Sequence, residues 1–119
     1  MKDKNLFRLE HIRDCIEKVE YLARVLHSQD HFETQWVEQD AIIRNLEIIG
    51  EAVANISDDL KQNYPNVSWN EIKGMRNFVI HNYFGVELNE IWSTVINDIP
   101  LLKNQIQEII EDLGNSCLE

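Results

Sequence analysis

The sequence is poor in the residues that interrupt helices and in those that cross-link chains. Glycine occurs four times and proline twice in 119 residues, so there are few turns, which favours long helices. The cysteines, Cys15 and Cys117, lie near opposite ends of the chain and predict reduced thiols rather than a disulfide framework. A glycine-rich phosphate loop, a cysteine-pair metal site and a Ser-His-Asp arrangement are all missing, which removes three common kinds of functional site.

Long apolar runs are also missing. No stretch approaches the roughly 20 apolar residues that a membrane-spanning helix needs. The first residues, 1–5, carry charges without an apolar segment behind them, so we expect no signal peptide. We therefore expect a cytoplasmic protein with no membrane partner. The length predicts one domain over residues 1–119, with room for a real core.

Positive charge is scarce as well. The chain has 11 basic residues against 21 acidic ones, a net charge of −10. Nucleic-acid binders usually show a basic surface, because neutralising phosphates supplies much of their affinity. Any nucleic acid must therefore meet a local basic patch, and its binding should be weak and salt-sensitive. Two explanations of the acidity stay open: it keeps the protein soluble, or it docks a partner protein.

The sequence is rich in apolar residues that recur every three or four positions. This spacing is typical of amphipathic helices, and it predicts them over about 4–27, 34–56 and 88–113. A shorter helix carries the polar motif described below. No segment alternates with period two for long enough to predict a strand. The fold class is therefore all-α, an up-and-down bundle of three long helices and one shorter, motif-bearing helix.

Local signals predict the boundaries of these helices. Ser68 to Glu71 reads as a capping box that starts the motif-bearing helix. The stretch 57–66 is predicted to be a loop. Pro100 predicts a kink or break in the last helix near residues 98–99, because proline cannot donate the helical hydrogen bond. Three tryptophans are predicted to lie in the core: Trp36, Trp69 and Trp92.

The run from Gly74 to Tyr83 contains the candidate catalytic residues. It reads Arg-Asn-x3-His-x-Tyr, and it places a permanent cation, Arg76, near a titratable imidazole, His81. This pairing suits a phosphodiester: Arg76 would offset the charge on phosphorus while His81 moves protons. On an α-helix Asn77 is four residues before His81, and it could fix which ring nitrogen carries the proton.

A duller interpretation of these residues stays open. Arg76 would pair with a carboxylate, Asn77 would cap backbone groups, and His81 would be a cation at a helix C-terminus. If His81 is catalytic, cleavage of a phosphodiester needs one group to take a proton and another to give one. One chain offers one such histidine in the motif. A two-fold dimer would bring two copies of Arg76 and His81 together, so we expect a composite cleft.

The motif resembles the signature of the HEPN superfamily, and Tyr83 after the histidine narrows the resemblance to the HepT-like branch. Glu87 stands where aspartate is more usual, a change that conserves charge. Three further blocks carry the resemblance: 41–52, 65–69 and 91–102. It implies a homodimeric toxin of a toxin–antitoxin system that cleaves RNA without a metal or other cofactor. It also implies a minimal nucleotidyltransferase as antitoxin partner and Tyr83 as acceptor of AMP, which silences the toxin. DNA is not expected as a partner.

Other candidates have two interpretations each. Arg44, Glu47 and Glu51 share one helix face, so they form either a solvated salt-bridge ladder or the rim of the cleft. His27 and His31 are spaced like a metal-binding pair, but a histidine beside a helix C-terminus is the better explanation. The rival to the ribonuclease hypothesis is a non-catalytic helical module that only binds a nucleotidyltransferase or its substrate.

Overall fold

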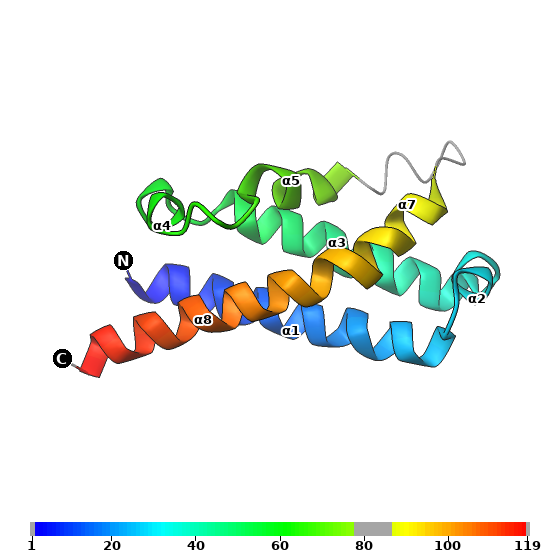
Figure 1. Cartoon of the computed structure of the whole chain (residues 1–119), viewed down its shortest axis with the longest axis horizontal. Coiled ribbons are helices and arrows are strands. Elements are labelled where there is room, and N and C mark those ends of the chain that lie inside the picture. Colours follow the sequence, from blue (N-terminus) through cyan, green and yellow to red (C-terminus); the bar gives the residue numbers. More distant parts are fainter. Residues whose placement is uncertain (1, 78–86, 119) are drawn as a thin grey trace.

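The computed structural model describes residues 2–77 and 87–118, and every regular element in these ranges is helical (Figure 1). The long helices are α1 (Lys2–Leu26), α3 (Trp36–Ala54) and α8 (Ile99–Leu118). Helix α1 packs against both α3 and α8. The predicted all-α class with three long helices is confirmed. None of the described helices combines the length and apolar character that crossing a lipid bilayer requires.

The core lies where the apolar faces of these helices meet. Its residues recur at three or four positions, as predicted, and burying each such side chain contributes about 1.5–3 kcal/mol. Phe32 and Trp92 stack with ring centroids 5.3 Å apart, which joins two segments that lie far apart in the sequence. The fully buried aliphatic residues of the long helices are Leu9, Ile12, Ile16, Val19, Ile42, Leu46, Ile49, Val53, Ile99, Ile106 and Ile109.

Two short helices were not predicted. Helix α2 (Gln29–Thr34) and helix α4 (Asp58–Asn63) lie in stretches predicted to be a break and a loop. The side chains of Ser28 and Ser57 cap them, each accepting a hydrogen bond from a backbone N–H three residues on, at 3.2 and 3.3 Å. Each helix is only six residues long, so periodicity cannot reveal it. The loop prediction over 57–66 is therefore wrong for its first part.

The segment that leads into the motif differs from the prediction in two ways. Helix α5 (Trp69–Lys73) does begin after Ser68, but the serine side chain makes no capping hydrogen bond, so the capping box is wrong. Trp69 anchors this start instead, by donating its indole N–H to the carbonyl of Tyr64 at 3.0 Å. After α5 the chain tightens into a 3-10 turn, η1 (Gly74–Asn77), rather than continuing as an α-helix.

The last predicted helix is interrupted ahead of its proline. Helix α7 (Leu88–Ser93) is followed by a π-helical turn, η2 (Thr94–Asp98), and then by α8. This confirms the predicted break: a proline ring at position 100 crowds the carbonyl four residues earlier, and the wider turn relieves that contact. The turn also changes the helical phase, and Ile96, an apolar residue within the predicted helix over 88–113, is 49% exposed. Trp69 and Trp92 are buried, whereas Trp36, at the first position of α3, is 69% exposed, against prediction.

Candidate functional site

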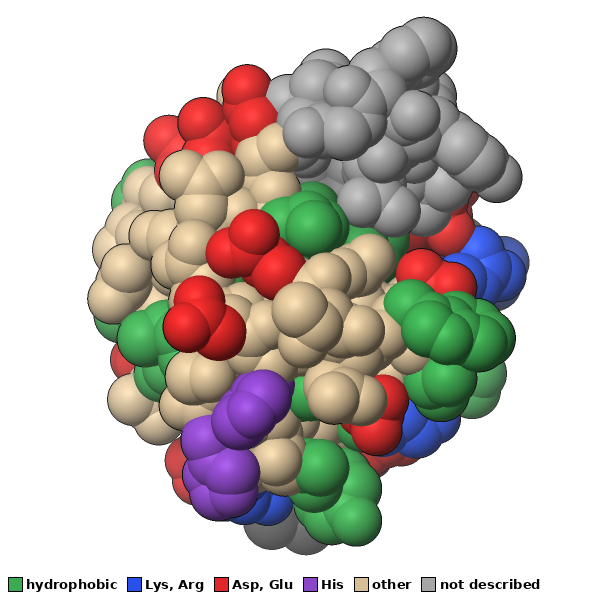
Figure 2. All heavy atoms as spheres, turned by 90° about the vertical axis from the view of Figure 1, so that its right-hand side faces the viewer, with side chains coloured by type: hydrophobic (Ala, Val, Ile, Leu, Met, Phe, Trp, Pro, Cys, Tyr) green, Lys and Arg blue, Asp and Glu red, His purple; other side chains and the backbone are tan. Residues whose placement is uncertain are grey.

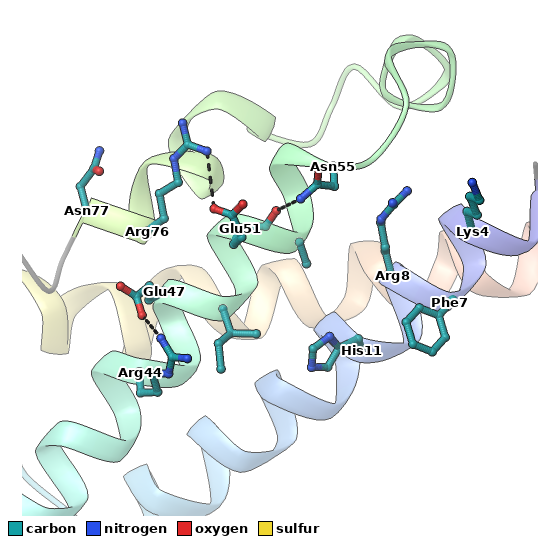
Figure 3. A pocket seen from close by; sticks show the side chains of 12 residues that line it. Lys4, Phe7, Arg8, His11, Arg44, Glu47, Glu51, Asn55, Arg76 and Asn77 are labelled. Atoms are coloured by element: carbon teal, nitrogen blue, oxygen red, sulfur yellow. Dashed lines mark hydrogen bonds and ion pairs between the residues drawn. The ribbon is translucent and has the colours of Figure 1, made fainter.

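A hollow of about 850 Å³ opens between α1, α3 and η1, and both described residues of the motif line it (Figure 3). Arg76 and Asn77 come from η1. Arg44, Glu47 and Glu51 come from one face of α3. The structure therefore brings the predicted rim residues and the first half of the motif to one place. The remaining polar residues around the hollow are Lys4, Arg8, His11 and Asn55.

The position of Arg76 depends on a close approach between η1 and α3. A Cβ atom at Gly50 would lie 2.6 Å from the backbone nitrogen of Arg76 and 3.0 Å from the carbonyl oxygens of Ile72 and Lys73. Only glycine leaves room for this contact. Met75 is 5% exposed and fixes the turn in the core, which leaves its neighbours Arg76 and Asn77 exposed. Sequence reasoning missed Gly50, although a glycine inside a helix is a signal of close packing.

Arg76 is held by a loose ion pair. Its Nη1 lies 3.6 Å from Oε2 of Glu51, and the two side chains are 43% and 63% exposed (Figure 3). Exposed pairs of this kind contribute about 0–1 kcal/mol. The pairing with a carboxylate is what the duller interpretation predicted. The ion pair nevertheless holds Arg76 beside the hollow. Because the pair contributes little free energy, a phosphate can replace Glu51 as the partner of Arg76.

Arg44 and Glu47 form a second ion pair one turn earlier on α3. On this face Glu47 pairs with Arg44 and Glu51 pairs with Arg76, and all three α3 residues line the hollow. Their role as the rim of a catalytic cleft stays a prediction. Glu47 is the less exposed partner, at 24% against 69% for Arg44. The guanidinium of Arg44 is thus left facing solvent beside the motif.

The far wall of the hollow belongs to α1 and was not predicted. Lys4, Arg8 and His11 follow one another at intervals of four and three, so they lie on one face of the helix. Figure 3 shows them across the hollow from Arg76, with Phe7 beside them. His11 is exposed, and nothing in the sequence linked it to the motif.

The second half of the motif, His81 and Tyr83, lies outside the described residues. The predicted geometry between Arg76 and Asn77 assumed an α-helix, with 100° between consecutive residues. Both residues lie in a 3-10 turn, where the angle is about 120°, so that assumption is wrong here. Their catalytic and supporting roles remain predictions.

The histidines at the end of α1 have a structural explanation. The Nδ1–H of His31 donates to the carbonyl oxygen of Leu26, in the last turn of α1, at 2.8 Å. This supports the interpretation of a histidine beside a helix C-terminus. Within residues 2–77 and 87–118, no three His, Cys, Asp or Glu side chains gather closely enough to hold a metal ion.

Comparison with known proteins identifies the family. The model of the family described as "Ribonuclease HepT-like" matches residues 12–109. The chain is 41% identical to "Probable ribonuclease HepT" of Thermococcus cleftensis, over 92% of this chain and 98% of that protein. It is 40% identical to a "Putative RNase" of Caldanaerobacter subterraneus, over 87% of this chain and 91% of that one.

A third relative is longer. The chain is 39% identical, over 97% of its length, to "Gamma-glutamylcyclotransferase and putative RNase" of Methanocaldococcus jannaschii, and it spans about half (51%) of that protein. No solved structure matches the chain significantly. The resemblance to the HepT-like branch is thus confirmed, and with it the predicted enzyme class at the level of the family.

Proposed function

We propose that this chain, which belongs to the ribonuclease HepT-like family, is a metal-independent endoribonuclease whose cleavage chemistry rests on Arg76 and His81. The observation that carries the proposal is the place of Arg76: a permanent cation over an open hollow, held only by an exposed pair with Glu51. A cation in this state can exchange its carboxylate partner for a phosphate, which arginine can bind through two parallel hydrogen bonds.

The reaction is an internal transesterification. A base takes the proton of a 2′-hydroxyl, the oxygen attacks phosphorus, and an acid gives a proton to the leaving 5′-oxygen. Arg76 stabilises the charge that develops on the phosphoryl oxygens. Histidine suits both proton transfers because its unperturbed pKa of about 6.5 is close to neutral pH. With one histidine in the motif of each chain, two copies of His81 in a symmetric dimer would supply base and acid.

The test is cleavage of a single-stranded RNA with product analysis. Activity should survive EDTA and leave a 2′,3′-cyclic or 3′-phosphate. Arg76→Ala and His81→Ala should each abolish cleavage while circular dichroism stays helical. Arg24→Ala is the matched control, because Arg24 is an exposed arginine in the last turn of α1. Strict dependence on a divalent ion, or full activity of His81→Ala, would contradict the proposal.

We further propose that the enzyme is the toxin of a toxin–antitoxin pair and that a minimal nucleotidyltransferase silences it by adding AMP to Tyr83. The support is the family and the sequence position of the phenol, two residues after His81. An added nucleotide would bring a bulky anion near the cleavage residues, where its phosphate competes for Arg76.

Tyr83→Phe tests this regulation. The variant should keep most of its ribonuclease activity, because no proton transfer is assigned to the phenol. It should escape silencing by the cognate nucleotidyltransferase and ATP, and intact-mass measurement should show AMP on the wild type alone. If Tyr83→Phe is silenced as fully as wild type, the partner acts by occlusion and not by modification.

The rival function, a binding module without catalysis, is favoured by the charge of the surface. Figure 2 views the end of the molecule that carries α2 and α7, and it shows scattered carboxylates with few lysines or arginines. Such a face suits a basic protein partner better than RNA. The cleavage assay separates the two functions, since a binding module would leave RNA intact while still binding the nucleotidyltransferase.

A further inference from the structure

The α1 wall of the hollow holds basic side chains that have no partner among the described residues. Lys4, Arg8 and His11 make no hydrogen bond or ion pair with any other described residue, whereas Arg44 and Arg76 opposite them are both paired. Lys4 and His11 are exposed and Arg8 is half-buried. At 1.5 Å per residue the row extends for about 10 Å along the helix, enough for more than one phosphate of a nucleic-acid strand.

An exposed aromatic ring lies in the same row. Phe7 is 71% exposed although it neighbours the core residues of α1, and it lines the hollow together with Ile48 and Ala52. An exposed phenylalanine among unpaired cations is costly for a purely structural surface, because its apolar area stays in water. Aromatic rings beside cations are typical of surfaces that bind single-stranded nucleic acid, where bases stack and phosphates pair.

A second hollow, of about 660 Å³, extends this surface past the N-terminal half of α1. Both hollows are lined by Lys4, Arg8 and Asn55, so they meet at the cations. Farther on, the second hollow is lined by Asp59 and Asp112. Carboxylates repel phosphates, so a strand that leaves Arg76 and follows α1 would find cations up to Lys4 and none beyond it among these lining residues.

We propose that the face of α1 formed by Lys4, Phe7 and Arg8 binds the single-stranded RNA that flanks the cleaved bond. Lys4 and Arg8 contact phosphates, and Phe7 stacks on a base. This inference rests on the proposed ribonuclease function for the identity of its ligand. The α1 face would then be a strand-binding surface outside the motif. It would select unpaired RNA, because bases within a duplex cannot stack on a protein ring.

Binding of a 2′-O-methyl RNA tests the surface without cleavage, since the attacking hydroxyl is blocked. A fluorescent oligonucleotide of about ten nucleotides is titrated with protein at several salt concentrations. Lys4→Gln/Arg8→Gln should weaken binding about tenfold for every sequence tried and lower the slope of log affinity against log salt by about 1.4, because each phosphate contact of a single strand adds about 0.7. Phe7→Ala should weaken binding about 5- to 150-fold with an unchanged slope.

The control is Lys18→Gln/Arg24→Gln, which removes the same charge from exposed positions farther along α1. It should bind nearly as wild type. Equal binding and equal slopes for the two double variants would overturn the proposal. So would a Phe7→Ala protein that binds normally but has changed from dimer to monomer in light scattering, because the ring would then serve a second copy of the chain.

The cleavage assay keeps this inference separate from the proposed function. If wild type binds the oligonucleotide through Lys4 and Arg8 but never cleaves RNA, the surface stands and the ribonuclease proposal fails. If cleavage depends on Arg76 and His81 while Lys4→Gln/Arg8→Gln binds as well as the control, the ribonuclease proposal stands and the α1 surface is wrong.

Discussion

Gly50 offers the sharpest test of how α3 positions the motif. In Gly50→Ala the new Cβ would lie 2.6 Å from the backbone nitrogen of Arg76, and ordinary contacts begin at 3.4 Å, so η1 must retreat by about 0.8 Å. The atoms in the way are backbone, as are the carbonyl oxygens at 3.0 Å, so no side chain can rotate to relieve the contact. The substitution thus moves Arg76 while leaving its side chain intact.

The magnitudes follow from two opposing terms. Alanine favours the helix over glycine by about 0.5–1 kcal/mol. Overpacking a well-packed contact costs about 1–3 kcal/mol. The difference is a net loss of about 0–2.5 kcal/mol in the free energy of unfolding. Activity should fall more steeply, because a displacement near 1 Å of a group that binds the reacting phosphate costs on the order of 100-fold in rate.

Two other glycines provide matched controls. A Cβ at Gly74 or at Gly114 would meet nothing within 4 Å. Gly114→Ala, within α8, should raise the free energy of unfolding by about 0.5–1 kcal/mol and leave cleavage unchanged. Gly74→Ala introduces the same methyl group into η1 itself, without the contact. Urea unfolding and kcat/KM on one RNA substrate measure both effects. A stabilised, fully active Gly50→Ala protein would refute the reasoning.

Three further predictions concern charge, pH and assembly. Glu51→Gln should raise affinity for 2′-O-methyl RNA a few-fold, measured by fluorescence anisotropy, because it removes the carboxylate that competes for Arg76. The Tyr64 hydroxyl donates a hydrogen bond to Asp112 at 2.8 Å. Burial is the largest cause that raises the pKa of Tyr64 to about 12, and the Asp112 carboxylate is the next. The contribution of Tyr64 to the free energy of unfolding is therefore complete below about pH 10, and it is lost as the pH rises through 12. Urea unfolding should show the stability of wild type approaching that of Tyr64→Phe over that range. Light scattering should show a dimer at micromolar concentration, and a monomer there would contradict the composite cleft.

The parts of the fold that were predictable are those where many residues repeat one signal. Helices α1, α3 and α8 each present several turns of apolar side chains, so a single exposed exception such as Trp36 does not alter the pattern. Six-residue helices contain too few apolar positions to show a repeating pattern: Phe32 in α2 and Leu60 in α4 are the buried residues of their helices. Their serine caps were the available signal.

The residues of the candidate site likewise fall into those that local sequence patterns predict and those that only the packed helices bring together. The motif predicted Arg76 and Asn77, and spacing on one helix face predicted Arg44, Glu47 and Glu51; all five line the hollow. The α1 wall could not be found in this way, because a hollow lined by residues about seventy positions apart is a property of the packed helices and not of local spacing. The 3-10 turn at Arg76 has a similar origin: it forms where the chain is pressed against Gly50.

The net charge of −10 does not decide whether RNA binds, because the cations are unevenly distributed. Six of the 11 lysines and arginines lie in α1, and Lys103, which follows the motif, is already paired with Glu20 at 2.9 Å. At physiological salt, charges more than about 8 Å away are screened, so a phosphate near Lys4 and Arg8 responds to those cations and hardly to the acidic remainder of the surface. At low salt the screening length grows to about 30 Å, and the acidic body then repels the same strand. The affinity for RNA should therefore increase less steeply, as the salt concentration falls, than the slope calculated from the number of phosphate contacts alone. This behaviour is expected for a local basic surface on an acidic protein.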